Sequence, residues 1–169
     1  QNTLIVYTSD HGCHFMTRNL DYKRSCHEGS THIPLIVSGG AYKDMGRTDR
    51  LVSLIDLPPT LLTAAGIDVP ENFDGIALQW GTERDCVFAQ ISESHNGRCV
   101  ITEKYTYSIS SGLNYSTDKY RDDYLYDRER DRGERRNLIN SPAYAKEKEK
   151  LRGLLVREML KAGESAPVI

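Results

Sequence analysis

The first forty residues alternate between two short apolar runs and a long polar stretch. Residues 4–9 are rich in β-branched and apolar side chains, and residues 33–37 form a second run of the same kind. Runs of this length and composition predict strands that are buried on both faces, as in a parallel α/β sheet. The polar segment between them therefore has both ends anchored in one sheet.

One helix follows these two strands. Asp56 is a candidate N-cap, two prolines occupy the first turn, and Gly66 follows the last apolar position. These signals predict where the helix begins and ends. Its apolar side chains are expected to pack against the sheet: Leu61, Leu62 and Ala65.

The pattern changes near residue 80. Short strands are predicted in close succession, at residues 86–92, 98–102, 105–110 and 124–127. Consecutive short strands are typical of an antiparallel sheet. A helix over residues 143–162 then begins at Ser141-Pro142 and carries an apolar stripe at helical spacing, Leu151, Leu154, Leu155 and Met159. We therefore predict two domains, residues 1–80 and 81–169.

The composition of the chain argues against some classes of function. Hydrophobic residues make up 38% of the chain, and the net charge is −2. These values are typical of a globular chain and argue against nucleic acid or a membrane surface as partner. The sequence has no apolar run near the roughly 20 residues of a membrane helix. The run of mixed charge over residues 128–136 is predicted to be a solvated turn.

Candidate chemistry begins where the first strand ends, at Asp10-His11-Gly12. In open α/β sheets, ligands collect beyond the carboxyl ends of strands. Gly12 permits the sharp turn that would let a carboxylate and an imidazole converge on a cation. From ligand chemistry alone, a capping role for Asp10 and a core hydrogen bond for His11 are equally open.

A structural zinc site is a second interpretation of this region. Five residues have the right side chains: His11, Cys13, His14, Cys26 and His27. Structural zinc sites use Cys and His in fours, usually with closely spaced pairs. The sequence contains no Cys-x2-Cys pair and no His-x3-His pair, which disfavours this alternative.

Several short segments, in their order along the chain, resemble the second half of the type I sulfatases, which belong to the alkaline-phosphatase-like superfamily. They are Asp10-His11-Gly12, Lys23, Glu28-Gly29, and residues 32–36, 51–62, 65–67, 74–75, 97–105 and 125–138. The resemblance implies a fold: the C-terminal part of an alkaline-phosphatase-like α/β/α sheet, followed by a small antiparallel sheet packed with a C-terminal helix.

The resemblance also implies a function, hydrolysis of sulfuric esters by a metal-dependent enzyme with a formylglycine nucleophile. The family's Cys-x-Pro-x-Arg or Ser-x-Pro-x-Arg segment is not in this sequence, and neither is its Asp-Asp metal pair. We therefore expect this chain to be the C-terminal portion of a longer enzyme, with the nucleophile upstream. The family favours a periplasmic, secreted or lysosomal-type compartment.

Roles for individual residues come from the same resemblance. Asp10 and His11 match the metal-binding pair. Calcium is expected first, with manganese or zinc as alternatives because imidazole suits softer ions. Lys23 matches the lysine that contacts the sulfate and the leaving-group oxygen. His32 stands where many relatives have Arg, and it would orient the substrate or donate a proton.

Weaker candidates for substrate binding are His14, His27, His95 and Arg98. The expected ligand is a sulfated small molecule or a sulfated glycan. Two other functions stay open: a phosphodiesterase or phosphonate monoester hydrolase of the same superfamily, and a non-catalytic binding domain that retains the fold. We expect the chain alone to be inactive, and either to self-associate through exposed strands or to have an irregular loop over Cys13–Thr31.

Overall fold

The computed structural model describes residues 3–81, 83–93, 95–112 and 118–169. The chain forms two compact units, and each is built from two stretches of sequence. The first unit comprises Gln1–Asp10 and Ile33–Val87, and the second comprises His11–His32 and Phe88–Ile169. The division into domains at residues 1–80 and 81–169 stays a prediction.

The first unit contains a two-stranded ribbon, β1 (Ile5–Thr8) and β2 (Leu35–Ser38). The strands are antiparallel, with Tyr7 opposite Ile36. Both strands lie in one sheet, as predicted, but their pairing is antiparallel, so the predicted parallel arrangement is wrong for these two strands. The remaining elements of this unit are η1 (Gly40–Tyr42), η2 (Leu54–Asp56), α2 (Leu57–Ala64) and η3 (Leu78–Trp80).

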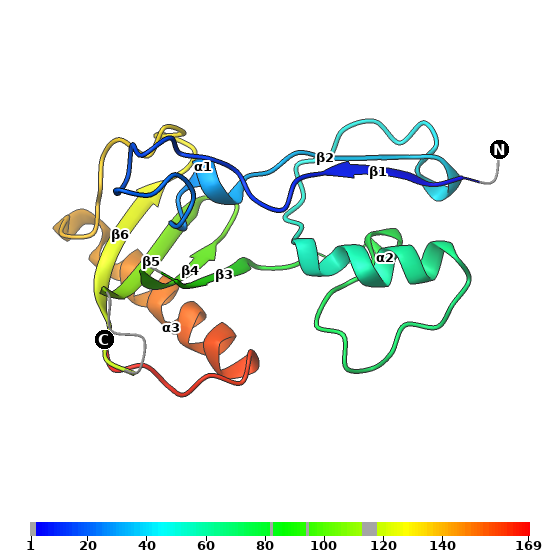
Figure 1. The fold of residues 1–169 in the computed structure, drawn as a ribbon. Helices are drawn as coiled ribbons and strands as arrows, with labels where there is room; N and C mark the ends of the chain where they lie inside the picture. Colours follow the sequence, from blue (N-terminus) through cyan, green and yellow to red (C-terminus); the bar gives the residue numbers. More distant parts are fainter. Residues whose placement is uncertain (1–2, 82, 94, 113–117) are drawn as a thin grey trace. The chain divides into compact units, whose positions relative to one another are not determined.

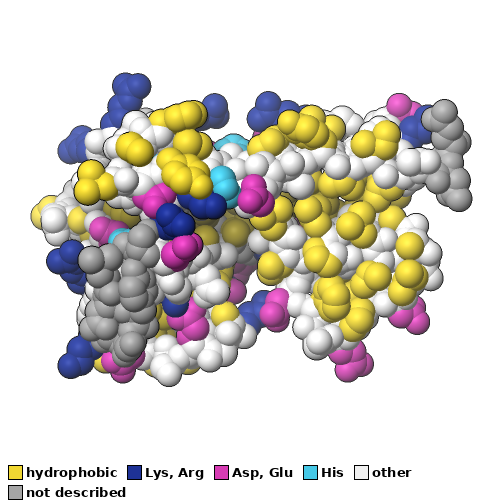
Figure 2. Space-filling view, viewed as in Figure 1, with side chains coloured by type: hydrophobic (Ala, Val, Ile, Leu, Met, Phe, Trp, Pro, Cys, Tyr) yellow, Lys and Arg dark blue, Asp and Glu magenta, His cyan; other side chains and the backbone are white. Residues whose placement is uncertain are grey.

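The ribbon is not buried on both faces, and that prediction is wrong. Ile5 and Tyr7 are each 62% exposed, and Ile36 is 60% exposed. Exposed and half-buried positions alternate along each strand because successive side chains point to opposite faces. Figure 2 shows hydrophobic side chains gathered over the part of the molecule that contains β1, β2 and α2.

Helix α2 ends where the sequence predicts, with Gly66 in the left-handed conformation at a φ of 70°. Its buried face is not the predicted one, because Leu61 is 50% exposed and Ala65 is also exposed. Thr60 is buried instead. Its hydroxyl donates to the Asp56 carbonyl at 2.6 Å and accepts from the Leu78 N–H at 2.9 Å. Polar contacts therefore decide which face of α2 turns inward.

The second unit is built around a four-stranded sheet in the order β3-β4-β5-β6. Its strands are β3 (Val87–Ser92), β4 (Asn96–Ile101), β5 (Tyr105–Gly112) and β6 (Arg121–Asp127). The pairs β4–β5 and β5–β6 are antiparallel, which confirms the predicted architecture. All six residues of β4 are buried, so both faces of this strand are covered.

One face of this sheet is covered by α3 (Ala145–Lys161), which follows η4 (Pro142–Tyr144) and packs on β4 and β5. Leu151, Leu155 and Met159 are its buried residues, as the apolar stripe predicts. Figure 1 shows α3 along one face and the short helix α1 (Glu28–Thr31) on the other. Among the described residues, no helix has the length and hydropathy needed to cross a membrane.

Candidate functional site

Residues 11–32, called the site segment from here on, carry most of the predicted site residues. The ends of the segment meet, because the Gly12 N–H donates to the Ser30 carbonyl at 2.8 Å. A Cβ at position 12 would lie 2.1 Å from the Gly29 carbonyl oxygen, so only glycine fits there. Within the segment, the His14 N–H donates to the Tyr22 carbonyl at 2.8 Å. The segment is thus a closed loop with its own hydrogen bonds.

The site segment packs against β4 and β6 through its second half. The His27 ring stacks on Tyr124, with 4.2 Å between the ring centroids. Cys26 is buried, and burial together with the neighbouring Cys26 thiol raises the pKa of the Cys99 thiol in β4. Burial lowers the pKa of His27 to about 3, so its imidazole is neutral at physiological pH. These contacts hold the segment on the sheet as a covering layer.

Glu134 ties the site segment to the turn after β6. Its Oε2 accepts from the Glu28 N–H at 3.0 Å, and Arg18 donates to the carbonyls of Gly133 and Glu134 at 2.7 Å each. Glu134 is 2% exposed and has a φ of 50°. Burial raises the pKa of its carboxyl to about 7, because desolvation outweighs the nearby positive charge.

The solvated turn predicted over residues 128–136 is therefore wrong at Glu134. A run of charges gives no sign that one member turns inward, so reasoning from charge alone missed this residue. The one available signal was the resemblance, whose last segment includes Glu134.

Asp10 and His11 lie directly after β1, where the sequence predicts them. Asp10 is exposed and ends the first unit, whereas His11 begins the second. The Nδ1 of His11 lies 2.7 Å from the Gly12 carbonyl oxygen. An Nδ1–H that donates to a carbonyl leaves Nε2 as the ligand nitrogen, which is a common arrangement for a metal-bound histidine.

The donor types of Asp10 and His11 therefore suit a divalent cation, but they supply only part of a coordination shell. Among the described residues, no three His, Cys, Asp or Glu side chains converge to hold a metal ion. The same finding removes support for the structural zinc alternative, since Cys26 and His27 are packed into the sheet instead.

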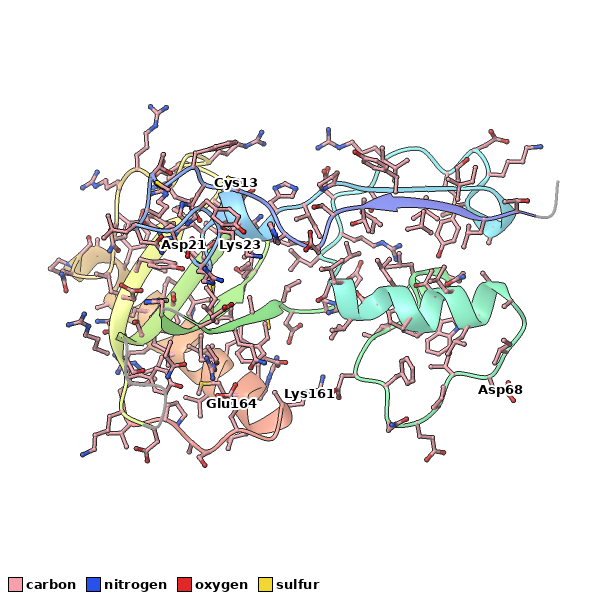
Figure 3. The ribbon with its side chains drawn as sticks, viewed as in Figure 1. Cys13, Asp21, Lys23, Asp68, Lys161 and Glu164 are labelled. Atoms are coloured by element: carbon pink, nitrogen blue, oxygen red, sulfur yellow. The ribbon has the colours of Figure 1, made fainter. Side chains whose placement is uncertain are left out.

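Lys23 lies on the same stretch of the site segment as Asp21, and Figure 3 labels both. The Asp21 carboxylate pairs with Arg24 at 2.6 Å, and this hydrogen bond lowers the pKa of Asp21 to about 2. The Lys23 ammonium lies 5.6 Å from the centre of the Tyr22 ring. The backbone N–H of Lys23 also donates to Oδ1 of Asp21 at 3.1 Å.

His32 follows α1 and has a side chain that is 69% exposed. Its Nδ1 lies 2.5 Å from Oε1 of Glu28, one helical turn earlier. The other carboxylate oxygen of Glu28 lies 3.3 Å from Arg128. His32 is thus open to solvent on one side and held by a carboxylate on the other.

The four weaker candidates have different surroundings. His14 and His27 are buried, so contact with a substrate would require the site segment to open. His95 lies 4.0 Å from the Asp123 carboxylate. Arg98 pairs with Glu164 at 2.8 Å and donates to the Ile91 carbonyl. Substrate binding by these residues stays a prediction.

An open groove of about 380 Å³ lies elsewhere on the second unit, lined by residues that include Lys104, Tyr105 and Tyr144. It contains none of the predicted site residues. The candidate site is therefore the surface of the site segment rather than this groove.

Comparison with known proteins finds sulfatases that are similar to this chain. The family model named Sulfatase matches residues 1–67. Arylsulfatase K of the dog, Canis lupus familiaris, is 44% identical over 78 residues, which is 46% of this chain and 15% of that protein. A solved structure described as a 2-O GAG sulfatase is 29% identical, with a TM-score of 0.82 over 96% of this chain and 37% of that one. Residues 1–67 are therefore similar to sulfatases in sequence, and nearly the whole chain is similar to a sulfatase in fold.

The solved structures extend the match beyond the family model, because they also cover the four-stranded sheet and α3. A phosphonate monoester hydrolase of Agrobacterium radiobacter is similar as well, at 25% identity and a TM-score of 0.75 over 94% of this chain and 35% of that one. The alkaline-phosphatase-like fold predicted from sequence is confirmed. The chain spans little more than a third of the solved structures that it matches.

Proposed function

We propose that this chain is the part of a metal-dependent sulfuric ester hydrolase that supplies a cation pair and two substrate-facing residues. The formylglycine nucleophile would be carried outside these residues. The observation that carries the proposal is the site segment, which matches the family in sequence and holds Lys23 and His32 on one folded loop with side chains that reach solvent.

Lys23 would stabilise negative charge. In hydrolysis of a sulfate ester, charge develops on the sulfate oxygens and on the oxygen of the departing alcohol. A fixed ammonium beside that oxygen lowers the barrier because its attraction is strongest in the transition state. The pairing of Asp21 with Arg24 supports this role, since it leaves the Lys23 charge uncompensated by that carboxylate.

His32 would transfer a proton. An imidazole titrates near neutral pH, so it can protonate a leaving alkoxide or orient the ester. Asp10 and His11 would hold a divalent cation, with calcium as the first choice and manganese or zinc as alternatives. Such a cation would neutralise charge on the sulfate when bound. Calcium takes about six to eight oxygen ligands, so further ligands would come from outside this chain.

The proposed substrate is a sulfated small molecule or a sulfated glycan. The similar structure described as a 2-O GAG sulfatase favours the glycan. Hydrolysis of a phosphonate or phosphodiester is the second candidate, which the match to the Agrobacterium enzyme favours. Turnover of an aryl sulfate and of the matching aryl phosphonate by the intact protein would distinguish these two reactions.

Lys23→Ala in the intact protein tests the proposal. Its turnover of a sulfate ester should fall by about a hundred- to a thousand-fold, as expected for loss of one transition-state charge contact. Lys43→Ala is the matched control, because Lys43 is an exposed lysine in the first unit. Equal rates for wild type and Lys23→Ala would contradict the proposed role.

Asp10→Ala tests the metal. This variant should lose both turnover and bound metal, measured by elemental analysis, while it keeps its thermal transition. Asp68→Ala, at an exposed position after α2, should lose neither. A wild-type protein that neither binds metal nor turns over any ester would instead favour the non-catalytic alternative.

A further inference from the structure

The carboxylate of Glu28 is held more firmly than a surface side chain normally is. Its Oε2 lies 3.3 Å from Arg128, its Oε1 lies 2.5 Å from Nδ1 of His32, and the backbone of Glu28 is held separately by its N–H, which donates to Glu134 at 3.0 Å. One carboxylate oxygen thus contacts Arg128, and the other contacts His32. The direction in which Glu28 presents Oε1 is therefore set by the surrounding structure.

Arg128 is itself fixed. Its Nη1 donates to the Thr102 carbonyl at 2.6 Å, and its own N–H donates to the Lys104 carbonyl at 2.7 Å. Both acceptors lie in the connection between β4 and β5, so the guanidinium is bound to the sheet of the second unit. Glu134, which holds the Glu28 backbone, is buried in the same unit. Arg128 thus holds the Glu28 carboxylate, and Glu134 holds the Glu28 backbone.

An ordinary interpretation of the Glu28–His32 contact is an exposed pair one helical turn apart. Such pairs contribute only about 0.3 to 0.5 kcal/mol, and they do not fix the geometry of either partner. The present contact differs because Glu28 is anchored from two other segments before it reaches His32. The anchoring would be unnecessary if the pair only helped to stabilise a helix of four residues.

We propose that Glu28 is a positioning residue that sets the ring orientation and the tautomer of His32. The carboxylate accepts the proton on Nδ1, so Nε2 is left on the exposed side of the ring to exchange a proton with a ligand. A base or acid that is oriented by a second group is a recurring arrangement in catalysis. The inference rests on the proposed function only in taking His32 as a group that acts on the substrate.

The tautomer is measurable without any turnover. The intact protein, with its histidines labelled with ¹⁵N, would be examined by NMR at a pH where the imidazole is neutral. Wild-type His32 should carry its proton on Nδ1. In Glu28→Ala it should shift toward the Nε2–H form that imidazole prefers in water. An unchanged His32 tautomer in a folded Glu28→Ala protein would overturn the proposal.

Arg128→Gln is the second variant, because it leaves Glu28 and the helix intact. Loss of the guanidinium should produce a mixture of the two tautomers of His32. Glu149→Ala, which removes an exposed acidic residue from α3, is the matched control and should leave the His32 signals unchanged. A fixed Nδ1–H tautomer in Arg128→Gln would overturn the part of the proposal that concerns Arg128.

Measurement of ester turnover by the intact protein is the second part of the test. Glu28→Ala should lower kcat by about ten- to a hundred-fold with KM little changed, as for loss of an orienting partner. In a His32→Ala background the same change should have no further effect. A shifted tautomer with unchanged kcat would overturn the positioning role. If the wild-type protein hydrolyses no ester, the proposed function fails, and the NMR result alone decides whether Glu28 sets the tautomer.

Discussion

The two units differ in how they use their apolar residues. In the second unit, strands β4, β5 and β6 have a buried core on which Leu155 and Met159 of α3 are almost fully enclosed. In the first unit, the strand residues Ile5 and Ile36 and the helix residue Leu61 are each at least half exposed. The second unit therefore has a core of its own, whereas the first leaves apolar surface open within the described chain.

The units also treat their buried carboxylates differently. Asp56 in the first unit accepts from the N–H groups of Ser53 and Ile76 at 2.8 Å each and pairs with Arg84 at 2.5 Å. Glu134 in the second unit has one oxygen with a backbone partner and one buried oxygen without any in the structure. A buried carboxylate whose oxygens both have hydrogen-bond partners stabilises a fold, whereas a buried oxygen without a partner costs free energy. The less stable of the two arrangements is that of Glu134, which contacts the site segment.

The largest expected effect is in the first unit. Asp56→Ala leaves Arg84 without its carboxylate and removes the acceptor of two backbone N–H groups. Loss of one partner of a buried pair costs about 3 to 5 kcal/mol. Amide exchange at Ile76 and Ser53 should accelerate strongly, while exchange in β5 should stay slow. Asp49→Ala, at an exposed carboxylate, is the control, and equal exchange in both variants would show that Asp56 does not hold this unit together.

The core of the second unit gives the next prediction. Leu155→Ala removes a fully buried side chain and should lower the free energy of unfolding by about 2 to 5 kcal/mol. Leu160→Ala, on the same helix but 52% exposed, should change it by only about 0.5 kcal/mol. Urea unfolding followed by circular dichroism measures both. Similar losses for the two variants would mean that α3 does not pack as described.

The carboxyl of Glu134 predicts a pH dependence. Its pKa is about 7 in the folded chain against an ordinary 4.5, so between these values the folded state binds more protons than the unfolded state. The free energy of unfolding should therefore fall as the pH rises from 4.5 through 7. The total is at most about 3.5 kcal/mol, since one pKa unit corresponds to about 1.4 kcal/mol.

Glu134→Gln is the test of that dependence. The variant should be about as stable as the wild type at pH 4.5 and more stable at pH 8, because the amide carries no charge to desolvate. Glu149→Gln, at an exposed residue of α3, should follow the wild-type curve. If wild type and Glu134→Gln show parallel curves, the carboxyl is not desolvated as the structure indicates.

The smallest effect on stability is expected at the exposed ribbon, where the readout is association instead. The chain alone should self-associate through β1 and β2, and Ile36→Lys should restore a monomer in sedimentation experiments, because a charge on an exposed strand opposes pairing. The change in unfolding free energy should be only about 0.5 kcal/mol. Ile67→Lys, at a similarly exposed residue after α2, should leave association unchanged. A monomeric wild-type chain would refute the prediction.

The sequence predicted the second unit best. The antiparallel sheet was predicted from short strands in close succession, and α3 was predicted from an apolar stripe at helical spacing, of which Leu151, Leu155 and Met159 are buried. The prediction of burial failed at β1 and β2. Their apolar composition indicates side chains that would be buried, but it does not show which part of a protein would bury them. The prediction of burial also failed at α2, because the hydroxyl of Thr60 has two hydrogen-bond partners and turns inward in place of Leu61.

The candidate site was only partly readable. Lys23 and His32 were proposed from the resemblance alone, since neither has a local pattern that separates it from an ordinary surface residue. The partners of Glu28 could not be found in this way. Arg128 is 100 residues away in sequence and Glu134 is 106 residues away, so only the folded chain brings them together. Polar contacts between residues so far apart in sequence produce no periodic pattern from which they could be predicted.

The division of the chain into units has a consequence for dissection. The chain passes between the units three times, after Asp10, after His32 and after Val87. A gene fragment that starts at residue 88 would encode nearly the whole four-stranded sheet and α3. It would omit Cys26 and His27, whose side chains cover Cys99 and Tyr124. The continuous fragment from residue 88 would thus leave one face of the sheet uncovered. The complete second unit also needs residues 11–32, and residues 33–87 of the first unit separate the two stretches in the sequence.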